Sequence, residues 1–452
     1  MSARVVTLWL LALLISACAA PTAAPATTPL PVMTPPPPGL TVIAPTATAT
    51  IFSPTVTPTL PLPAPLTPCG VQLPILPAHN QPTTTSLAPD WELLALLQSR
   101  IPDPARNAFD YLLANPGNVG LAAYRVNEPT RGVYLNADTQ MPLASVVKVL
   151  HLVTYAEAVA AGQLNPLTEV LLTDIEAYYQ PGLDLNAHPN AVADLERRER
   201  LYGNPPTLLL DEVPGMMIEF SDNAATDYLH IMLGQTALES TALTYGLTQQ
   251  TAPCPFVGQF LSMANPLRPD SNDNAVVNAY IADPASYGHD AMALTLTYSA
   301  DPDFRAATIA SRDTTRRPNG STQRLFTATL NAHGTPAEYA ALMTRIATNG
   351  LSTPDASYLA RRYLEWPTRF AANQALFTNV AYKGGSLPGV LTLVYYAYPL
   401  DGSAPIVVAL FFRDLDGDTY RTWRRTLAHD EFARWLLSDP DAISLLAALI
   451  GQ

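Results

Sequence analysis

Ser145 and Lys148 stand three residues apart within an otherwise apolar stretch, residues 141–150. On a helix, side chains three apart lie on the same face, one turn from each other. A neutral lysine amine in that position can take the serine proton and turn a weak hydroxyl into a nucleophile. For this role near pH 7, the pKa of Lys148 must fall by roughly 3 pH units through its surroundings. The pair therefore predicts a serine nucleophile with a lysine base.

Lysine is rare in this chain. Of the 25 basic residues, 23 are arginines and two are lysines, Lys148 and Lys383. Arginine keeps its proton in proteins, whereas a desolvated lysine can lose it. Lys383 ends a predicted strand and precedes Gly384-Gly385-Ser386. Both lysines are therefore candidates for chemistry.

The tripeptide Ser221-Asp222-Asn223 separates an apolar helical segment from a predicted helix at 224–233. Serine, aspartate and asparagine are all favoured helix N-caps, so capping alone explains the tripeptide. Only its combination with the other candidates favours a catalytic role.

The periodicity of the folded part predicts strands at both ends and helices between them. Helices are expected from Asp90, at 104–114, from Ser145 to about 161, at 335–349, at 420–437 and at 442–450. Strands are expected at 119–126, 133–136, 380–383, 390–398 and 406–413. Residues 246–333 show little period and predict loops and exposed turns. Two early and three late strands predict an α/β (α+β) fold with one five-stranded antiparallel sheet, flanked by helices.

The first residues indicate export. Residues 1–17 contain Arg4, an apolar run and small residues, which is typical of a targeting segment too short to span a membrane. Residues 15–18 resemble the lipobox of a bacterial lipoprotein, which implies cleavage before Cys18 and its acylation. An ordinary signal peptide that happens to contain a cysteine is the alternative. The expected location is extracytoplasmic, with a lipid anchor in the cell membrane.

Residues 18–89 are mainly Pro, Thr and Ala with almost no charge, so they predict an extended, disordered linker before a folded domain at 90–452. Cys69 lies in this linker. It could pair with Cys254 in an oxidising envelope, or remain unpaired.

The bulk composition limits the partners. A net charge of −13 argues against nucleic-acid binding. The seven histidines lack a metal-binding spacing, so we expect no metal site and no cofactor. We expect a monomer.

The three motifs Ser145-x-x-Lys148, Ser221-Asp222-Asn223 and Lys383-Gly384-Gly385 occur in an order that resembles the penicilloyl-serine transferase superfamily. Within it, they are similar to those of the class A β-lactamases. The resemblance covers residues 90–437. It implies an all-helical subdomain packed against the sheet, with Ser145 at their junction. It also implies a small substrate, either a β-lactam or a peptidoglycan peptide.

The resemblance implies four catalytic roles. Ser145 would attack a carbonyl and form an acyl-enzyme, and Lys148 would activate it directly or through a water. Ser221 would relay a proton to the leaving nitrogen. Lys383 would supply positive charge to Ser221 and to a substrate carboxylate.

The resemblance also implies substrate-binding roles. Asn223 would hold the amide side chain of the substrate, and Gly385 would allow a close backbone approach. The backbone N–H groups of Ser145 and Ser386 would form an oxyanion hole.

The sequence departs from the family pattern in two ways. Gly384 stands where the family has Thr or Ser. The family also deacylates with a glutamate after Ser-Asp-Asn, but no glutamate occurs between Glu239 and Glu338. Asp270 or Asp273 could replace it, although no spacing argument selects either.

Three functions remain open. The leading one is β-lactam ring opening with turnover. A D,D-peptidase acting on peptidoglycan stems would use the same acylation chemistry. A catalytically weak module that binds cell-envelope components would use none. These alternatives differ in the fate of the acyl group: rapid clearance, persistence, or no adduct.

Overall fold

The computed structural model describes residues 67–74, 90–266, 273–314 and 318–452. The predicted signal peptide, the lipidation site Cys18, most of the predicted linker and Asp270 lie outside the described residues. No helix in the described ranges is both long and apolar enough to cross a membrane.

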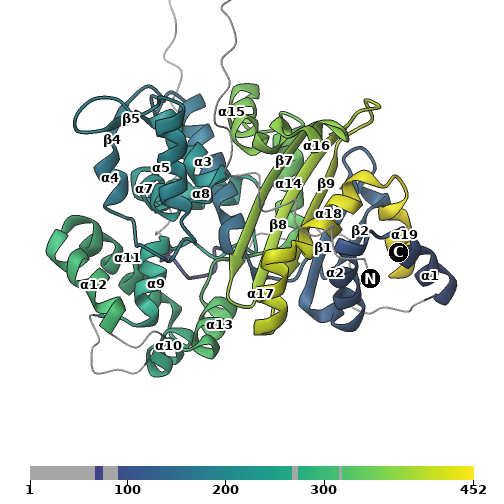
Figure 1. Ribbon diagram of the computed structural model, residues 1–452, viewed down its shortest axis with the longest axis horizontal. Coiled ribbons are helices and arrows are strands. Elements are labelled where there is room, and N and C mark those ends of the chain that lie inside the picture. Colours follow the sequence, from purple (N-terminus) through teal and green to yellow (C-terminus); the bar gives the residue numbers. More distant parts are fainter. Residues whose placement is uncertain (1–66, 75–89, 267–272, 315–317) are drawn as a thin grey trace, which may run out of the picture. The chain divides into compact units, whose positions relative to one another are not determined.

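A five-stranded antiparallel sheet in the order β2–β1–β9–β8–β7 forms the centre of the folded part (Figure 1). Its strands are β1 (Val119–Arg125), β2 (Val133–Leu135), β7 (Phe377–Leu387), β8 (Val390–Pro399) and β9 (Ile406–Phe412). The first two come from the beginning of the domain and the other three from its end, which confirms the predicted sheet.

Helices cover both faces of this sheet. Side chains alternate between the two faces along each strand, so neighbouring apolar residues enter different cores. On one face, Leu410 and its neighbours share a core with α2 and α18; on the other, Phe411 and its neighbours pack against α14 and the helical subdomain. Strand β9 is consequently buried along its whole length.

The helices associated with the sheet come from both ends of the domain. They are α1 (Trp91–Arg100), α2 (Asp103–Ala114), α14 (Pro336–Ala347), α15 (Pro354–Leu364), α16 (Ala371–Gln374), α17 (Gly417–Thr426), α18 (Ala428–Ser438) and α19 (Ala442–Leu449), with the 3-10 turns η1 (Pro116–Asn118), η2 (Pro129–Arg131) and η5 (Trp366–Arg369). As predicted, the Asp90 side chain caps α1, where it accepts the backbone N–H groups of Glu92 and Leu93.

The middle of the chain forms the predicted helical subdomain (teal and green in Figure 1), which is not all-helical because it also contains two short strand pairs. Its elements are η3 (Ala144–Val147), α3 (Lys148–Ala160), α4 (Leu172–Glu176), α5 (Ala187–Arg197), η4 (Leu210–Glu212), α6 (Val213–Glu219), α7 (Asn223–Leu233), α8 (Gln235–Thr244) and α9 to α13, with two short strand pairs, β3 (Met141–Pro142) with β6 (His333–Gly334) and β4 (Glu169–Leu171) with β5 (Thr207–Leu209). Helix α3 shares one core with the sheet face that carries Phe411, so Ser145, the predicted nucleophile, lies at the predicted junction.

The prediction of loops for residues 246–333 is wrong, because five helices occupy much of this range. They are α9 (Phe256–Met263), α10 (Asp273–Ala282), α11 (Pro284–Ala300), α12 (Pro302–Thr314) and α13 (Gly320–Thr329). Most of their buried apolar residues form two small clusters, while Phe256 and Phe260 of α9 pack in or against the main core.

A short stretch of the predicted linker belongs to the folded domain. Within residues 67–74, Cys69 forms a disulfide with Cys254. Leu73 is 1% exposed and its backbone N–H donates to Gln250 O. The linker boundary expected at residue 89 is therefore corrected for this stretch, and the open question of the disulfide is answered by pairing.

Candidate active site

Ser145 lies in the 3-10 turn η3 that leads into α3. The preceding residue, Ala144, has a left-handed φ of 46°, a conformation that non-glycine residues keep only when their surroundings enforce it. Here the N–H of Ala144 donates to Asn331 Oδ1 at 2.9 Å. One residue earlier, Leu143 O accepts the hydroxyl of Thr392 at 2.7 Å. These bonds fix the turn that presents the serine.

Strand β7 approaches this turn so closely that only glycine fits at position 385. A Cβ added to Gly385 would lie 2.7 Å from both Leu143 O and Ser145 N. Gly384 is constrained differently, since its Cβ would lie 2.1 Å from the hydroxyl oxygen of Tyr382. A threonine at 384 would therefore have to displace Tyr382, which explains the glycine.

Lys148 is completely buried beneath the site. Its Nζ donates to Ser221 O at 2.6 Å and to Asn223 Oδ1 at 2.7 Å, and it lies 4.6 Å from the centre of the Phe256 ring. Burial lowers the pKa of Lys148 from 10.5 to about 7, although nearby aspartates, Asp222 foremost, oppose this. The pKa thus reaches the range that the sequence argument required.

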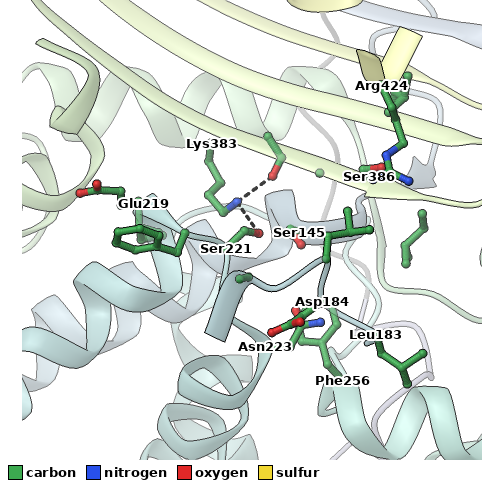
Figure 2. A pocket seen from close by; sticks show the side chains of 18 of the residues that line it. Ser145, Leu183, Asp184, Glu219, Ser221, Asn223, Phe256, Lys383, Ser386 and Arg424 are labelled. Atoms are coloured by element: carbon green, nitrogen blue, oxygen red, sulfur yellow. Dashed lines mark hydrogen bonds between the residues drawn. The ribbon is translucent and has the colours of Figure 1, made fainter. Parts of the chain in front are cut away.

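Ser221-Asp222-Asn223 both caps a helix and contributes side chains to the pocket. Asp222 caps α7, accepting the N–H groups of Ala224 and Ala225. Ser221 has a left-handed φ of 62°, and its Oγ accepts Lys383 Nζ at 2.9 Å (Figure 2). The capping residue therefore sets the turn, and its two neighbours face the lysines.

Lys383 is 2% exposed and donates to Gly384 O at 2.7 Å as well as to Ser221. Burial, followed by the positive charge of Lys148, lowers the pKa of Lys383 well below its ordinary value. Two ammonium groups that share one serine hydroxyl disfavour each other's charge. An anionic ligand in the pocket would favour the protonated form of Lys383.

These residues meet at one pocket of about 400 Å³, within the size range of small-molecule sites. It is lined by the predicted site residues Ser145, Ser221, Asn223, Lys383, Gly385 and Ser386 (Figure 2). The Ser386 hydroxyl also bonds the Tyr420 hydroxyl at 3.0 Å. All seven predicted catalytic and substrate-binding residues, with Lys148 beneath, are thus brought together.

Two carboxylates that were not predicted from the sequence also line the pocket, Asp184 and Glu219. Glu219 forms an ion pair with Arg369. Asp184 precedes α5 and accepts the backbone N–H groups of Asn186 at 3.1 Å and His188 at 2.8 Å. Burial raises the pKa of Asp184. Its local pattern predicts only a turn before a helix, so no signal in the sequence linked it to the site.

A buried histidine also escaped the sequence analysis. His188 Nδ1 lies 2.8 Å from Asp222 Oδ2, and both side chains are nearly inaccessible. Burial opposes the charged imidazole, but the hydrogen bond and the negative charge of Asp222 raise the pKa of His188. His188 therefore ties α5 to the turn that carries Ser221.

The chain after Ser221-Asp222-Asn223 brings aromatic side chains, Phe256 and Phe260, to the pocket. The Asp227 carboxylate fixes this approach by accepting Phe256 N at 2.6 Å and Val257 N at 2.7 Å. Of the two aspartates considered from the sequence, Asp270 is outside the described residues and Asp273 is the first residue of α10.

The fold and the pocket are consistent with a serine hydrolase, and a comparison with protein families gives the same class of protein. Residues 104–435 match the model of the beta-lactamase enzyme family, so the chain belongs to that family. No curated protein matches the chain.

Several solved structures are similar to this chain. A beta-lactamase from Sphaerobacter thermophilus DSM 20745 is 17% identical with a TM-score of 0.47, over 79% of this chain and 98% of that one. PBP-A is 15% identical with a TM-score of 0.43, over 77% and 99%. A beta-lactamase from Chitinophaga pinensis DSM 2588 is 14% identical with a TM-score of 0.42, over 77% and 97%.

Proposed function

We propose that this protein is a serine hydrolase that opens β-lactam rings through an acyl-enzyme on Ser145. The observation that carries the proposal is the state of Lys148, a buried amine with a lowered pKa one helical turn from the serine. Such an amine can accept a proton near pH 7, which an ordinary lysine cannot.

The hydrogen bonds of Lys148 suit a base. A neutral amine has two N–H groups and one lone pair. The two short bonds to Ser221 O and Asn223 Oδ1 use both N–H groups. The lone pair remains to accept the Ser145 proton while Oγ attacks the carbonyl, directly or through a water.

Ser221 and Lys383 would complete the acylation step. Ser221 Oγ lies between the two lysine amines, at 3.4 Å from Lys148 Nζ and 2.9 Å from Lys383 Nζ. It can therefore pass a proton to the nitrogen that leaves when the ring opens. Lys383 would regain its proton beside the carboxylate of the substrate.

Substrate binding would use the remaining pocket residues. Asn223 keeps its NH₂ group for the substrate, because its oxygen is held by Lys148. The backbone N–H groups of Ser145 and Ser386 would form the oxyanion hole. Removing one such donor typically costs about 3 kcal/mol in transition-state stabilisation.

A D,D-peptidase is the second candidate, and one observation favours it. The segment after Ser221-Asp222-Asn223 places Phe256 over Lys148 instead of a carboxylate. Without a base for water, the acyl-enzyme would persist and could be transferred to an amine.

Time-resolved intact-mass spectrometry of the full chain mixed with benzylpenicillin tests the proposal. We expect an adduct that forms and clears while penicilloate accumulates, and no adduct on the Ser145→Ala variant. A wild-type adduct that persists would favour the peptidase. If no Ser145-dependent adduct forms, β-lactam chemistry is refuted and the binding module remains.

We also propose that Cys18 is acylated after signal cleavage and anchors a monomer outside the cytoplasmic membrane. The apolar run before Cys18 supports this. Labelling with a palmitate analogue tests it, since the label should appear on the wild type and disappear from the Cys18→Ser variant.

A further inference from the structure

A second, much smaller cavity adjoins the Ser145 pocket. Its volume is about 10 Å³, roughly the space that one water molecule occupies. Leu183, Asp184, Asn223 and Phe260 line both cavities. Two of these shared residues, Asp184 and Asn223, are drawn below Ser145 in Figure 2, so the small cavity lies next to the part of the pocket that holds the serine.

Gln180 gives this cavity an unsatisfied polar group. Its side chain lines the cavity and the residue is 7% exposed. Gln180 Oε1 is buried and has no hydrogen-bond partner among the described residues. Because buried polar atoms are almost always hydrogen-bonded, this oxygen points to a bound water.

Asp184 and Asn223 supply the other two partners that a water needs. The Asp184 carboxylate is held in place by the backbone N–H groups of Asn186 and His188, so it cannot swing away. Lys148 holds the oxygen of Asn223 and leaves its NH₂ group as a donor. A water that donates to Asp184 and Gln180 and accepts from Asn223 keeps one lone pair for attack.

We propose that Asp184 is the general base that activates this water to hydrolyse the acyl-enzyme. The inference rests on the proposed function and names the base that the sequence did not reveal. The water oxygen bonds to the acyl carbonyl carbon and its proton passes to Asp184. When the tetrahedral intermediate collapses, the bond to Ser145 Oγ breaks and Oγ receives, by way of solvent, the proton that Asp184 took from the water. This step restores both the Ser145 hydroxyl and the Asp184 carboxylate.

The other carboxylate in the pocket is a poorer candidate. Glu219 is paired with the Arg369 guanidinium, which holds its charge and lowers its basicity. Asp184 has no arginine or lysine ion-pair partner among the described residues and lies beside the unsatisfied Gln180. Its burial also makes it a better base than an exposed aspartate.

The test measures adduct formation and adduct decay separately, with benzylpenicillin and the full chain. Asp184→Asn should still form an adduct, and this adduct should decay about 100-fold more slowly than that of the wild type, or worse. Gln180→Leu leaves the Asp184 backbone contacts intact and should slow decay about tenfold. As a control, Asp174→Asn removes an exposed carboxylate of α4 and should change neither rate.

The outcomes separate this inference from the proposed function. Decay at the wild-type rate in Asp184→Asn overturns the inference and leaves the β-lactamase proposal standing. A wild-type adduct that never decays overturns it too, in favour of the peptidase. If the wild type forms no adduct, the proposed function fails and the inference with it. If Asp184→Asn does not fold, decay in Gln180→Leu decides: a slower rate supports the inference and an unchanged rate overturns it.

Discussion

Replacing Lys148 with methionine should stabilise the protein at neutral pH while abolishing acylation. The amine lies in a fully buried site, and its pKa is lowered from 10.5 to about 7. That difference corresponds to roughly 5 kcal/mol of preference for the neutral amine. Below pH 7 the folded protein therefore carries mainly an ammonium at this position, which would be better solvated in the unfolded chain.

Methionine fills a similar volume without a charge. The change removes two hydrogen bonds, to Ser221 O and Asn223 Oδ1, at about 1 kcal/mol each. The net gain should be about 3 kcal/mol at pH 7.

The sign of the pH dependence follows from proton linkage. Between pH 7 and about 10 the unfolded chain binds a proton at Lys148 that the folded protein has lost, so wild-type stability rises with pH in this window. The advantage of Lys148→Met should shrink by roughly 2 to 3 kcal/mol between pH 7 and pH 9.

Urea unfolding of both proteins at pH 6.5, 7 and 9 measures these free energies. Lys148→Arg is the matched control, because a guanidinium stays charged and should destabilise the fold at every pH. The reasoning is refuted if Lys148→Met is less stable than the wild type at pH 7, or if the difference does not change with pH.

Three further predictions concern the nucleophile turn, the disulfide and a histidine pair. Gly385→Ala should push β7 away from Ser145 N and lower the acylation rate at least tenfold, measured as adduct formation; acylation at the wild-type rate would contradict the close approach. Cys69→Ser should lower the free energy of unfolding by roughly 2 to 5 kcal/mol in urea titrations, because the disulfide closes a sequence separation of 185; a change of a few tenths would show that the bridge is dispensable. His151 Nε2 and His230 Nδ1 are buried and lie 3.0 Å apart; burial lowers the pKa of His151 to about 4 and lowers that of His230 well below its ordinary value. Because these imidazoles are neutral in the folded protein, the free energy of unfolding should keep its full value above pH 6.5 and fall as the pH drops toward 4, by roughly 3 kcal/mol for His151. In urea unfolding, His151→Phe should make this pH dependence shallower.

The elements that carry strong patterns were predictable from the sequence. Each strand of the sheet has a continuous or alternating apolar pattern, and the three motifs fix their own geometry over one helical turn or one strand. The capping residues Asp90 and Asp222 were recognisable because a cap depends only on the next three residues. Local sequence patterns therefore sufficed to predict the strands of the sheet and the helical segment that carries Ser145 and Lys148.

The missed features depend on contacts between distant segments. Helices α10 and α11 show weak apolar periodicity, and α9 to α13 pack mostly in small satellite clusters, although Asp283-Pro284 and Asp301-Pro302 mark two helix starts. Asp184 lies at the pocket just before α5, which is tied to Asp222 through His188. No spacing along the chain encodes that contact.

The sheet has a consequence for the way the chain is made. Its strand β1 pairs on one side with β2, which follows at once, and on the other with β9, which follows only after residue 405. At roughly 5–20 residues per second, a ribosome needs roughly 15 to 60 seconds to supply that second partner. Throughout this interval the β1–β2 hairpin presents an unpaired edge that other nascent chains can join. Chaperone protection before the chain is complete should therefore matter more for this protein than for one whose neighbouring strands are made in succession.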